Sequence, residues 1–273
     1  MPFRHAHWWI LSLFPLAGLA FWPNYLSVMS TSPLSYHLHG ITASMWLILL
    51  AVQSWSIHHG SRAFHKTNGL VSLALFPLFL AGGASIFVGM AQRHVQGVTP
   101  FSQIWPPHLA WLDFVAIGGM SFFYFQALKQ RRKVGPHSSY LLATAIFLLP
   151  PILGRLAPIP LGLDFSDPGV FAKMGPSFHL GNVVSALIAF AIASRAARNG
   201  RPFVIAGLLV LMSSLLFEFP GGTPAWKAIY AHAAAIPTVP FALATAVAGA
   251  AIGWAGWLAG KKQAAPRLDA LPG

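Results

Sequence analysis

The chain has 273 residues, of which 56% are hydrophobic and 8% are charged, and its formal net charge at pH 7 is +12. So few charged side chains cannot solvate a soluble globule of this length, and the absence of cysteine excludes disulfides and thiolate metal sites. The positive charge lies in short loops, where anionic lipid headgroups explain it better than nucleic acid does. We therefore expect no nucleic-acid partner.

Eight apolar stretches follow one another along the chain, each close to the roughly 20 residues that a helix needs to cross a bilayer. They cover residues 7–26, 37–58, 68–91, 109–128, 138–156, 177–197, 202–219 and 237–259. The sequence therefore predicts an all-α, polytopic helical bundle in a lipid bilayer, with residues 1–273 forming a single integral membrane domain. Residues 37–156 are the expected four-helix core, and residues 1–36 and 157–273 are accessory.

The first stretch has two interpretations. Arg4 before it and the small residues of Ala17-Gly18-Leu19-Ala20 within it are compatible with a cleaved signal peptide. The bulky Phe21-Trp22-Pro23 that follows, and the single basic residue ahead, favour a retained helix instead.

Lys and Arg alternate between the two sides of the predicted bundle. One side carries Arg93, Arg155, Lys173 and Lys227. The other carries Arg4, Arg62, Lys66, Lys129, Arg131, Arg132, Lys133, Arg195, Arg198, Arg201, Lys261, Lys262 and Arg267. Because basic residues accumulate in cytoplasmic loops, both termini are predicted to be cytoplasmic, and the location that follows is the bacterial inner membrane.

The chain has 12 histidines against five acidic residues. The second to fifth of the predicted helices each begin at or beside a histidine. In chain order these are His39, His65, His108 and His137. Since successive helices alternate in direction, His39 and His108 should lie at the outer surface and His65 and His137 at the inner one. In a four-helix arrangement each pair faces across the core, where two imidazoles are the axial ligands of a b-type haem. His5, His7, His58 and His59 are interpreted as cytoplasmic loop residues.

Other residues of the core share faces with these histidines. His39, Trp46 and Gln53 are spaced by seven, so they drift only about 20° per step and form one stripe that should face protein. His137 and Arg155 are eighteen residues apart, roughly 27 Å along one helix face. Arg155 is expected to meet a haem propionate or a lipid phosphate. The alternative is an ion pair with Asp164 or Asp167.

Two rival interpretations use other residues. A metal-dependent membrane hydroxylase or hydrolase acting on lipid would bind iron, zinc or copper through an outer-face set of imidazoles and carboxylates. That set is His94, His179, His232, Asp113 and Glu218. The third interpretation is a cofactor-free transporter or assembly subunit whose histidines are interfacial.

The last stretch carries small residues four apart, first Gly249 and Gly253 and then Gly256 and Gly260. This spacing lets a neighbouring backbone approach closely. Packing within the chain is the expected use of this face, and an oligomer through Gly249 and Gly253 is the alternative.

The spacings within residues 37–156 carry a resemblance. His39 with Gln53, His65 with Gly69, and His137 with Arg155 resemble the signature of a large family of uncharacterised bacterial multi-pass membrane proteins. The arrangement is more distantly similar to the ascorbate-reducible transmembrane cytochromes b, which use histidines on four consecutive helices in two diagonal pairs. The leading interpretation of the chain is a membrane oxidoreductase whose second to fifth helices hold one or two b-type haems, and which passes electrons between a quinol or small reductant and an acceptor across the membrane. Trp46 and Gln53 would then line the haem pocket.

Overall fold

The computed structural model describes residues 3–262, and over this range the secondary structure is helical without strands. Seven helices are long and apolar enough to cross a membrane, which agrees with a multi-pass membrane protein. Five of them are single helices: α3 (Leu34–His58), α4 (Arg62–Gln96), α6 (Pro106–Lys129), α10 (Arg201–Glu218) and α12 (Thr238–Lys262). The sixth is built from α7 (Val134–Ala143), η2 (Thr144–Leu148) and α8 (Leu149–Leu156) in succession. The seventh is η3 (Val170–Lys173) followed by α9 (Gly175–Arg195).

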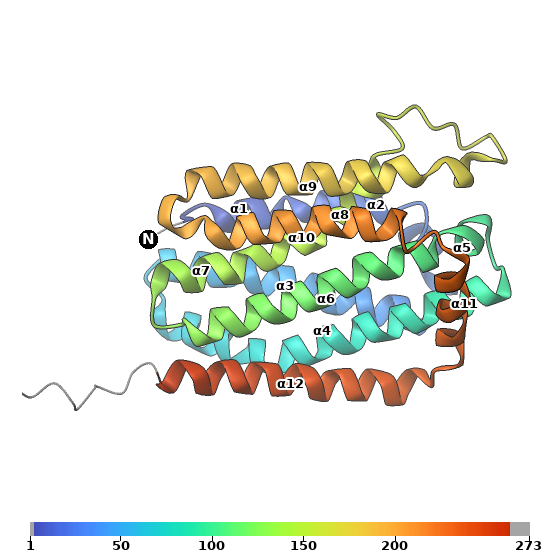
Figure 1. The fold of residues 1–273 in the computed structure, drawn as a ribbon. Helices are drawn as coiled ribbons and strands as arrows, with labels where there is room; N and C mark the ends of the chain where they lie inside the picture. Colours follow the sequence, from blue (N-terminus) through green and yellow to red (C-terminus); the bar gives the residue numbers. More distant parts are fainter. Residues whose placement is uncertain (1–2, 263–273) are drawn as a thin grey trace, which may run out of the picture.

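The predicted first span is two short helices, α1 (Ala6–Leu11) and α2 (Leu13–Phe21), followed by η1 (Leu26–Thr31). The break lies at Ser12, whose hydroxyl donates to the Trp9 carbonyl at 2.7 Å. A segment from Ala6 to Phe21 is about 24 Å long as a helix, less than the roughly 30 Å of a hydrocarbon core. This segment runs along the bundle, roughly parallel to α9 and α10 (Figure 1).

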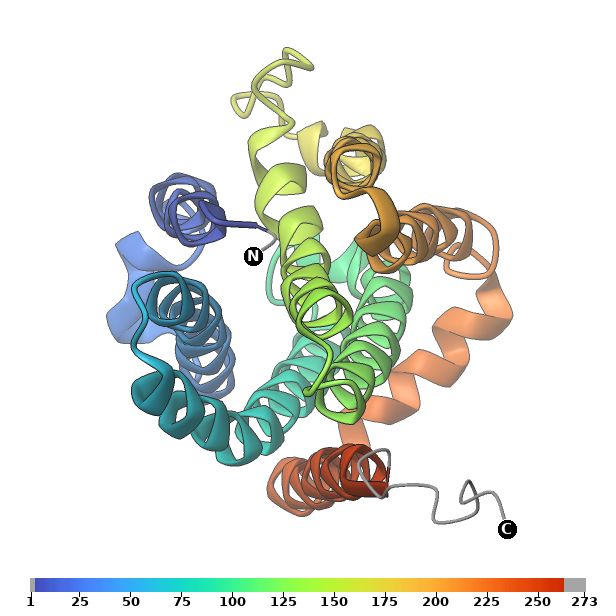
Figure 2. The same ribbon diagram turned by 90° about the vertical axis from the view of Figure 1, so that its left-hand side faces the viewer.

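The bundle has two unlike ends. We call the basic end the one where α3, α6 and α9 finish and α4, α7 and α10 begin, on the left of Figure 1. Short connections join the helices there, at 59–61, 130–133 and 196–200. These connections and the helix ends beside them carry nine of the 17 Lys and Arg, namely Arg62, Lys66, Lys129, Arg131, Arg132, Lys133, Arg195, Arg198 and Arg201. The opposite end carries the short helices α5 (Pro100–Ile104), α11 (Pro224–His232) and η5 (Ala233–Ala235). Figure 2 views the bundle from the basic end.

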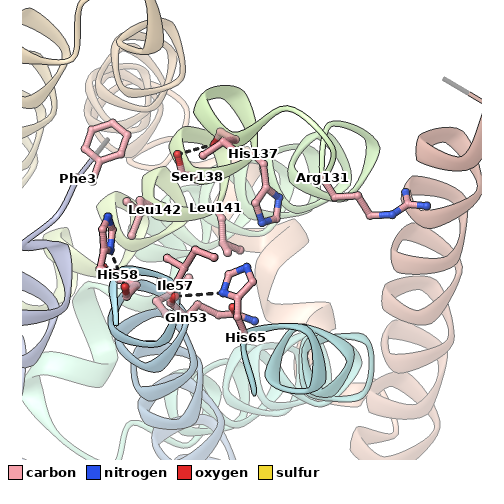
Figure 3. A pocket seen from close by; sticks show the side chains of 13 residues that line it. Phe3, Gln53, Ile57, His58, His65, Arg131, His137, Ser138, Leu141 and Leu142 are labelled. Atoms are coloured by element: carbon pink, nitrogen blue, oxygen red, sulfur yellow. Dashed lines mark hydrogen bonds between the residues drawn. The ribbon is translucent and has the colours of Figure 1, made fainter. Parts of the chain in front are cut away.

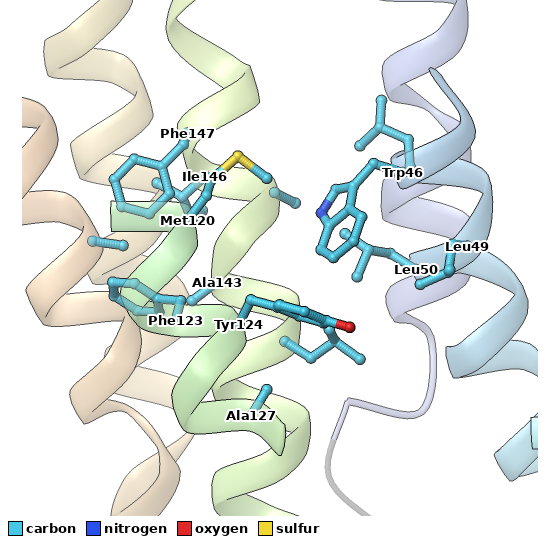
Figure 4. Packing of buried hydrophobic residues seen from close by; sticks show 14 of the residues in the cluster. Trp46, Leu49, Leu50, Met120, Phe123, Tyr124, Ala127, Ala143, Ile146 and Phe147 are labelled. Atoms are coloured by element: carbon cyan, nitrogen blue, oxygen red, sulfur yellow. The ribbon is translucent and has the colours of Figure 1, made fainter. Parts of the chain in front are cut away.

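Aromatic side chains fill the centre between α3, α4, α6 and α7 (Figure 4). Trp46, Phe76 and Tyr124 are fully buried, and the rings of Phe76 and Tyr124 stack at 4.3 Å. Both polar groups in this cluster are paired: the Trp46 indole N–H donates to the Thr144 hydroxyl at 3.0 Å, and the Tyr124 hydroxyl bonds that of Ser72 at 2.8 Å. Pairing of this kind is what a buried aromatic with a polar atom requires.

The glycine face of α12 is used inside the chain. A Cβ on Gly249 would lie 3.0 Å from the Cα of Pro77 in α4, and one on Gly256 would lie 2.9 Å from the Phe125 carbonyl oxygen in α6. A Cβ on Gly253 would lie 3.5 Å from side-chain atoms of Leu73 and Tyr124. The small residues therefore let α12 pack closely on α4 and α6, as expected for packing within one chain.

Candidate histidine site

Two of the predicted ligand histidines meet at the basic end. His65 lies in the first turn of α4 and His137 in the first turn of α7, and their ring centroids are 6.4 Å apart with the rings at 88° to each other. Figure 3 shows the two rings pointing toward one another across a pocket. We call this pair and its pocket the histidine site.

Backbone carbonyls set the chemistry of both rings. His65 donates from Nδ1 to the Gln53 carbonyl at 3.2 Å, and His137 donates from Nδ1 to the Ala127 carbonyl at 2.8 Å. Ala127 lies in the last turn of α6, where carbonyls have no partner within the helix. Since a carbonyl only accepts, each Nδ1 carries the proton and each Nε2 keeps a free lone pair.

A cavity of about 240 Å³ adjoins the two rings. It is lined mainly by apolar side chains from α3 and α7, namely Leu50, Ile57, Leu141 and Leu142, with Phe3 at its edge. A free imidazole lone pair beside an apolar wall is a suitable setting for a metal or a metal-bearing cofactor.

Three buried polar atoms with no hydrogen-bond partner belong to residues that line the same cavity. They are Oε1 of Gln53, Oγ of Ser54 and Nε2 of His58, all in the last two turns of α3. Leaving such an atom unpaired costs about 1–3 kcal/mol. Their convergence on one cavity marks it as a place where a bound group is expected.

The sequence predicts Arg131 only as one of the basic residues that orient the bundle, and the structure shows that it also lines this cavity. Its guanidinium points away toward α12, where it lies 4.3 Å over the Trp257 ring and donates to the Trp257 carbonyl at 2.8 Å. Partial burial lowers the pKa of Arg131, and the charge of Arg132 lowers it further. Arg131 therefore ties α12 to the loop before His137. A contact across 126 residues leaves no signal in sequence spacing.

The other predicted ligands, His39 and His108, lie at the opposite end in different surroundings. His39 packs against Phe79 at 6.5 Å, and its Nδ1 is buried without a partner. His108 donates from Nδ1 to the Phe217 carbonyl at 3.0 Å and lies against the Trp105 ring at 5.3 Å. No ring contact joins these two imidazoles within residues 3–262. The reason is that α10 packs on α6, and the His108 ring bonds a carbonyl at the end of α10.

Arg155 belongs to the opposite end as well. It donates to the Pro151 carbonyl at 2.8 Å, and its guanidinium lies 4.4 Å over the Phe21 ring of α2. The alternative ion pair with Asp164 or Asp167 is not formed, because Asp167 pairs with Lys173 at 2.6 Å and Asp164 caps its own turn at the Ser166 N–H. Arg155 instead lies close enough to His39, Asp113 and Tyr36 for its positive charge to interact with these three side chains.

The stripe predicted on α3 faces protein, as expected. Trp46 is fully buried and Gln53 is 5% exposed. Their surroundings differ, since Trp46 belongs to the aromatic centre and Gln53 lines the histidine site.

The residues of the alternative outer metal site are not gathered into a ligand set. His179 and Glu218 contact each other at 3.1 Å, whereas His94 donates to the Ser102 carbonyl at 2.9 Å. Within the described part of the chain, no three His, Asp or Glu side chains are grouped so that they could hold a metal ion. This finding includes His232 and Asp113, the two other residues of the set.

The chain has also been compared with known proteins. Family models, curated proteins and solved structures give no match to it. The function is therefore inferred from the geometry of the histidine site.

Proposed function

We propose that this protein is an integral membrane haem protein that holds a b-type haem between His65 and His137 and carries electrons. The observation that supports it is the separation of the two rings. Metal–imidazole bonds of about 2.0–2.1 Å place the centroids of two in-line imidazoles roughly 6–6.5 Å apart. The observed 6.4 Å falls in this range.

The residues of the site have distinct tasks in this proposal. His65 and His137 would bind the haem iron through Nε2. The backbone carbonyls of Gln53 and Ala127 keep the proton of each ring on Nδ1 and make Nε2 a more basic metal ligand. Leu50, Leu141 and Leu142 would contact the apolar face of the macrocycle. The haem would supply a one-electron iron couple, and ligation by two histidines leaves no open position for oxygen, which favours electron transfer.

The volume of the cavity limits what can bind without a rearrangement of side chains. At about 240 Å³ it is smaller than the roughly 300–1,000 Å³ of most small-molecule sites. Seating a porphyrin therefore requires side chains of the lining to move outward. The redox partner belonging to this proposal is a quinol or another small reductant.

A spectrum of the purified protein tests the proposal. The full chain, expressed with haem precursor and purified in detergent, should show a Soret band and, after dithionite reduction, a sharp α band. The pyridine haemochrome assay should give close to one haem per chain. His65→Ala and His137→Ala should each abolish the bands while leaving the elution volume unchanged.

The matched control is His94→Ala, which removes an imidazole at the opposite end that also donates to a carbonyl. This variant should keep its full haem content. Colourless wild-type protein, or equal haem content in the His65→Ala and wild-type proteins, would contradict the proposal.

A further inference from the structure

A second pair of imidazoles meets at the basic end, outside the histidine site. His7 of α1 and His59, directly after α3, have ring centroids 6.2 Å apart with the rings at 72°. His7 is only 6% exposed and lies within α1, which corrects its interpretation as a loop residue.

Both rings have nitrogen atoms available for a ligand. His59 donates from Nδ1 to the Trp55 carbonyl at 2.8 Å, so its Nε2 keeps a free lone pair. The Nδ1 of His7 is buried and has no hydrogen-bond partner. A buried imidazole nitrogen without a partner is unfavourable, and a bound group would relieve this cost.

The surroundings indicate which ligand would bind. His5 and His58 are also within electrostatic range of His7, and no carboxylate pairs with any of these imidazoles in residues 3–262. Neutral imidazoles without carboxylates suit Cu²⁺, Ni²⁺ or Zn²⁺, whereas Mg²⁺ and Ca²⁺ require oxygen ligands.

We propose that a divalent transition-metal ion binds between His7 and His59. The centroid separation of 6.2 Å is close to the roughly 6–6.5 Å expected for two imidazoles in trans positions on one ion, an arrangement that square-planar Cu²⁺ or Ni²⁺ allows. Water would occupy the remaining positions, because within residues 3–262 no third His, Asp or Glu completes the set.

Binding there would have a structural effect. The ion would join α1 to the end of α3, next to the histidine site. Phe3, four residues before His7, lines that cavity and packs on Phe203 of α10 at 5.5 Å. A metal-linked α1 would hold this N-terminal segment over the edge of the cavity.

Copper titration of the tag-free full-length protein in detergent tests the proposal. Electron paramagnetic resonance should show one tightly bound Cu²⁺ per chain with superhyperfine splitting from two nitrogens. His59→Ala should lower the affinity at least tenfold and leave a one-nitrogen signal. This variant is the safer one for folding because His59 is exposed, whereas His7→Ala removes a buried ring.

Controls separate this site from the histidine site. His94→Ala and His232→Ala should bind Cu²⁺ as the wild-type protein does, and His59→Ala should keep any haem absorbance. Copper affinity that is unchanged in His59→Ala, or that is lost only in His65→Ala, would overturn the proposal.

Discussion

At the residue scale, hydrogen bonds rather than residue identity distinguish the histidines from one another. His65, His137 and His108 all donate from Nδ1 to a carbonyl, but only the first two rings face each other. The positions of these residues at helix starts could be read from the sequence, because the apolar stretches mark where helices begin. Their carbonyl partners could not, since Gln53 and Ala127 belong to the ends of other helices.

The bond between Trp46 and Thr144 allows a prediction at this scale. Thr144→Val keeps the shape of the side chain but leaves a fully buried indole N–H without an acceptor. We expect a loss of about 1–3 kcal/mol in the free energy of unfolding, measured by denaturation in mixed micelles. Thr67→Val is the control, because that hydroxyl is exposed and donates only within its own helix. Equal stability of the two variants would show that the Trp46 bond contributes little.

At the element scale, small residues decide how closely helices approach. The spacing of glycines in the last predicted span indicated a packing face, and the structure shows that α4 and α6 occupy it. The choice between a neighbour in the same chain and a second chain was open in the sequence. The spacing of small residues describes one helix face and carries no information about the helix that covers it.

Gly256 provides the corresponding prediction. Leucine there would force its Cβ to 2.9 Å from the Phe125 carbonyl oxygen and push α12 away from α6. Overpacking of this kind costs about 1–3 kcal/mol, so Gly256→Leu should lower the melting temperature in detergent. Gly118→Leu makes the same substitution in a helix where no atom lies within 4 Å, and should melt as the wild-type protein does. A Gly256→Leu protein with unchanged melting would contradict the packing of α12.

The first predicted span shows a limit of composition at the element scale. The predicted span, residues 7–26, is apolar except for a few positions such as His7 and Ser12, and this composition predicts a single helix. The helix is broken at Ser12, where the hydroxyl bonds a carbonyl three residues back. A hydrogen bond from a serine hydroxyl to a carbonyl three or four residues back slightly destabilises a helix and often bends it.

At the scale of the whole molecule, both ends of the described chain lie at the basic end. Phe3 lines the histidine site there, and α12 finishes at the same end. Together with the basic loops, this arrangement predicts that the basic end faces the cytoplasm. A fluorescent protein fused after residue 273 should therefore fluoresce, and alkaline phosphatase inserted at Gly162 should be active. The reverse pattern of reporter activity would contradict this orientation and place the histidine site at the outer surface.

Seven long apolar helices of residues 3–262 and the segregation of charge could be predicted from the sequence alone, because each helix is a continuous apolar run and the basic residues lie in the loops beside these runs. The eighth predicted span, residues 7–26, is instead two short helices. The tertiary structure decided which imidazoles meet. His65 and His137 face each other because the beginnings of α4 and α7 lie side by side at the basic end. His108 instead bonds a carbonyl of α10, and His39 packs against Phe79. The proximity of His7 and His59 was likewise decided only by the packing of α1 on α3, since separate helices come together through their side chains and not through their order in the chain.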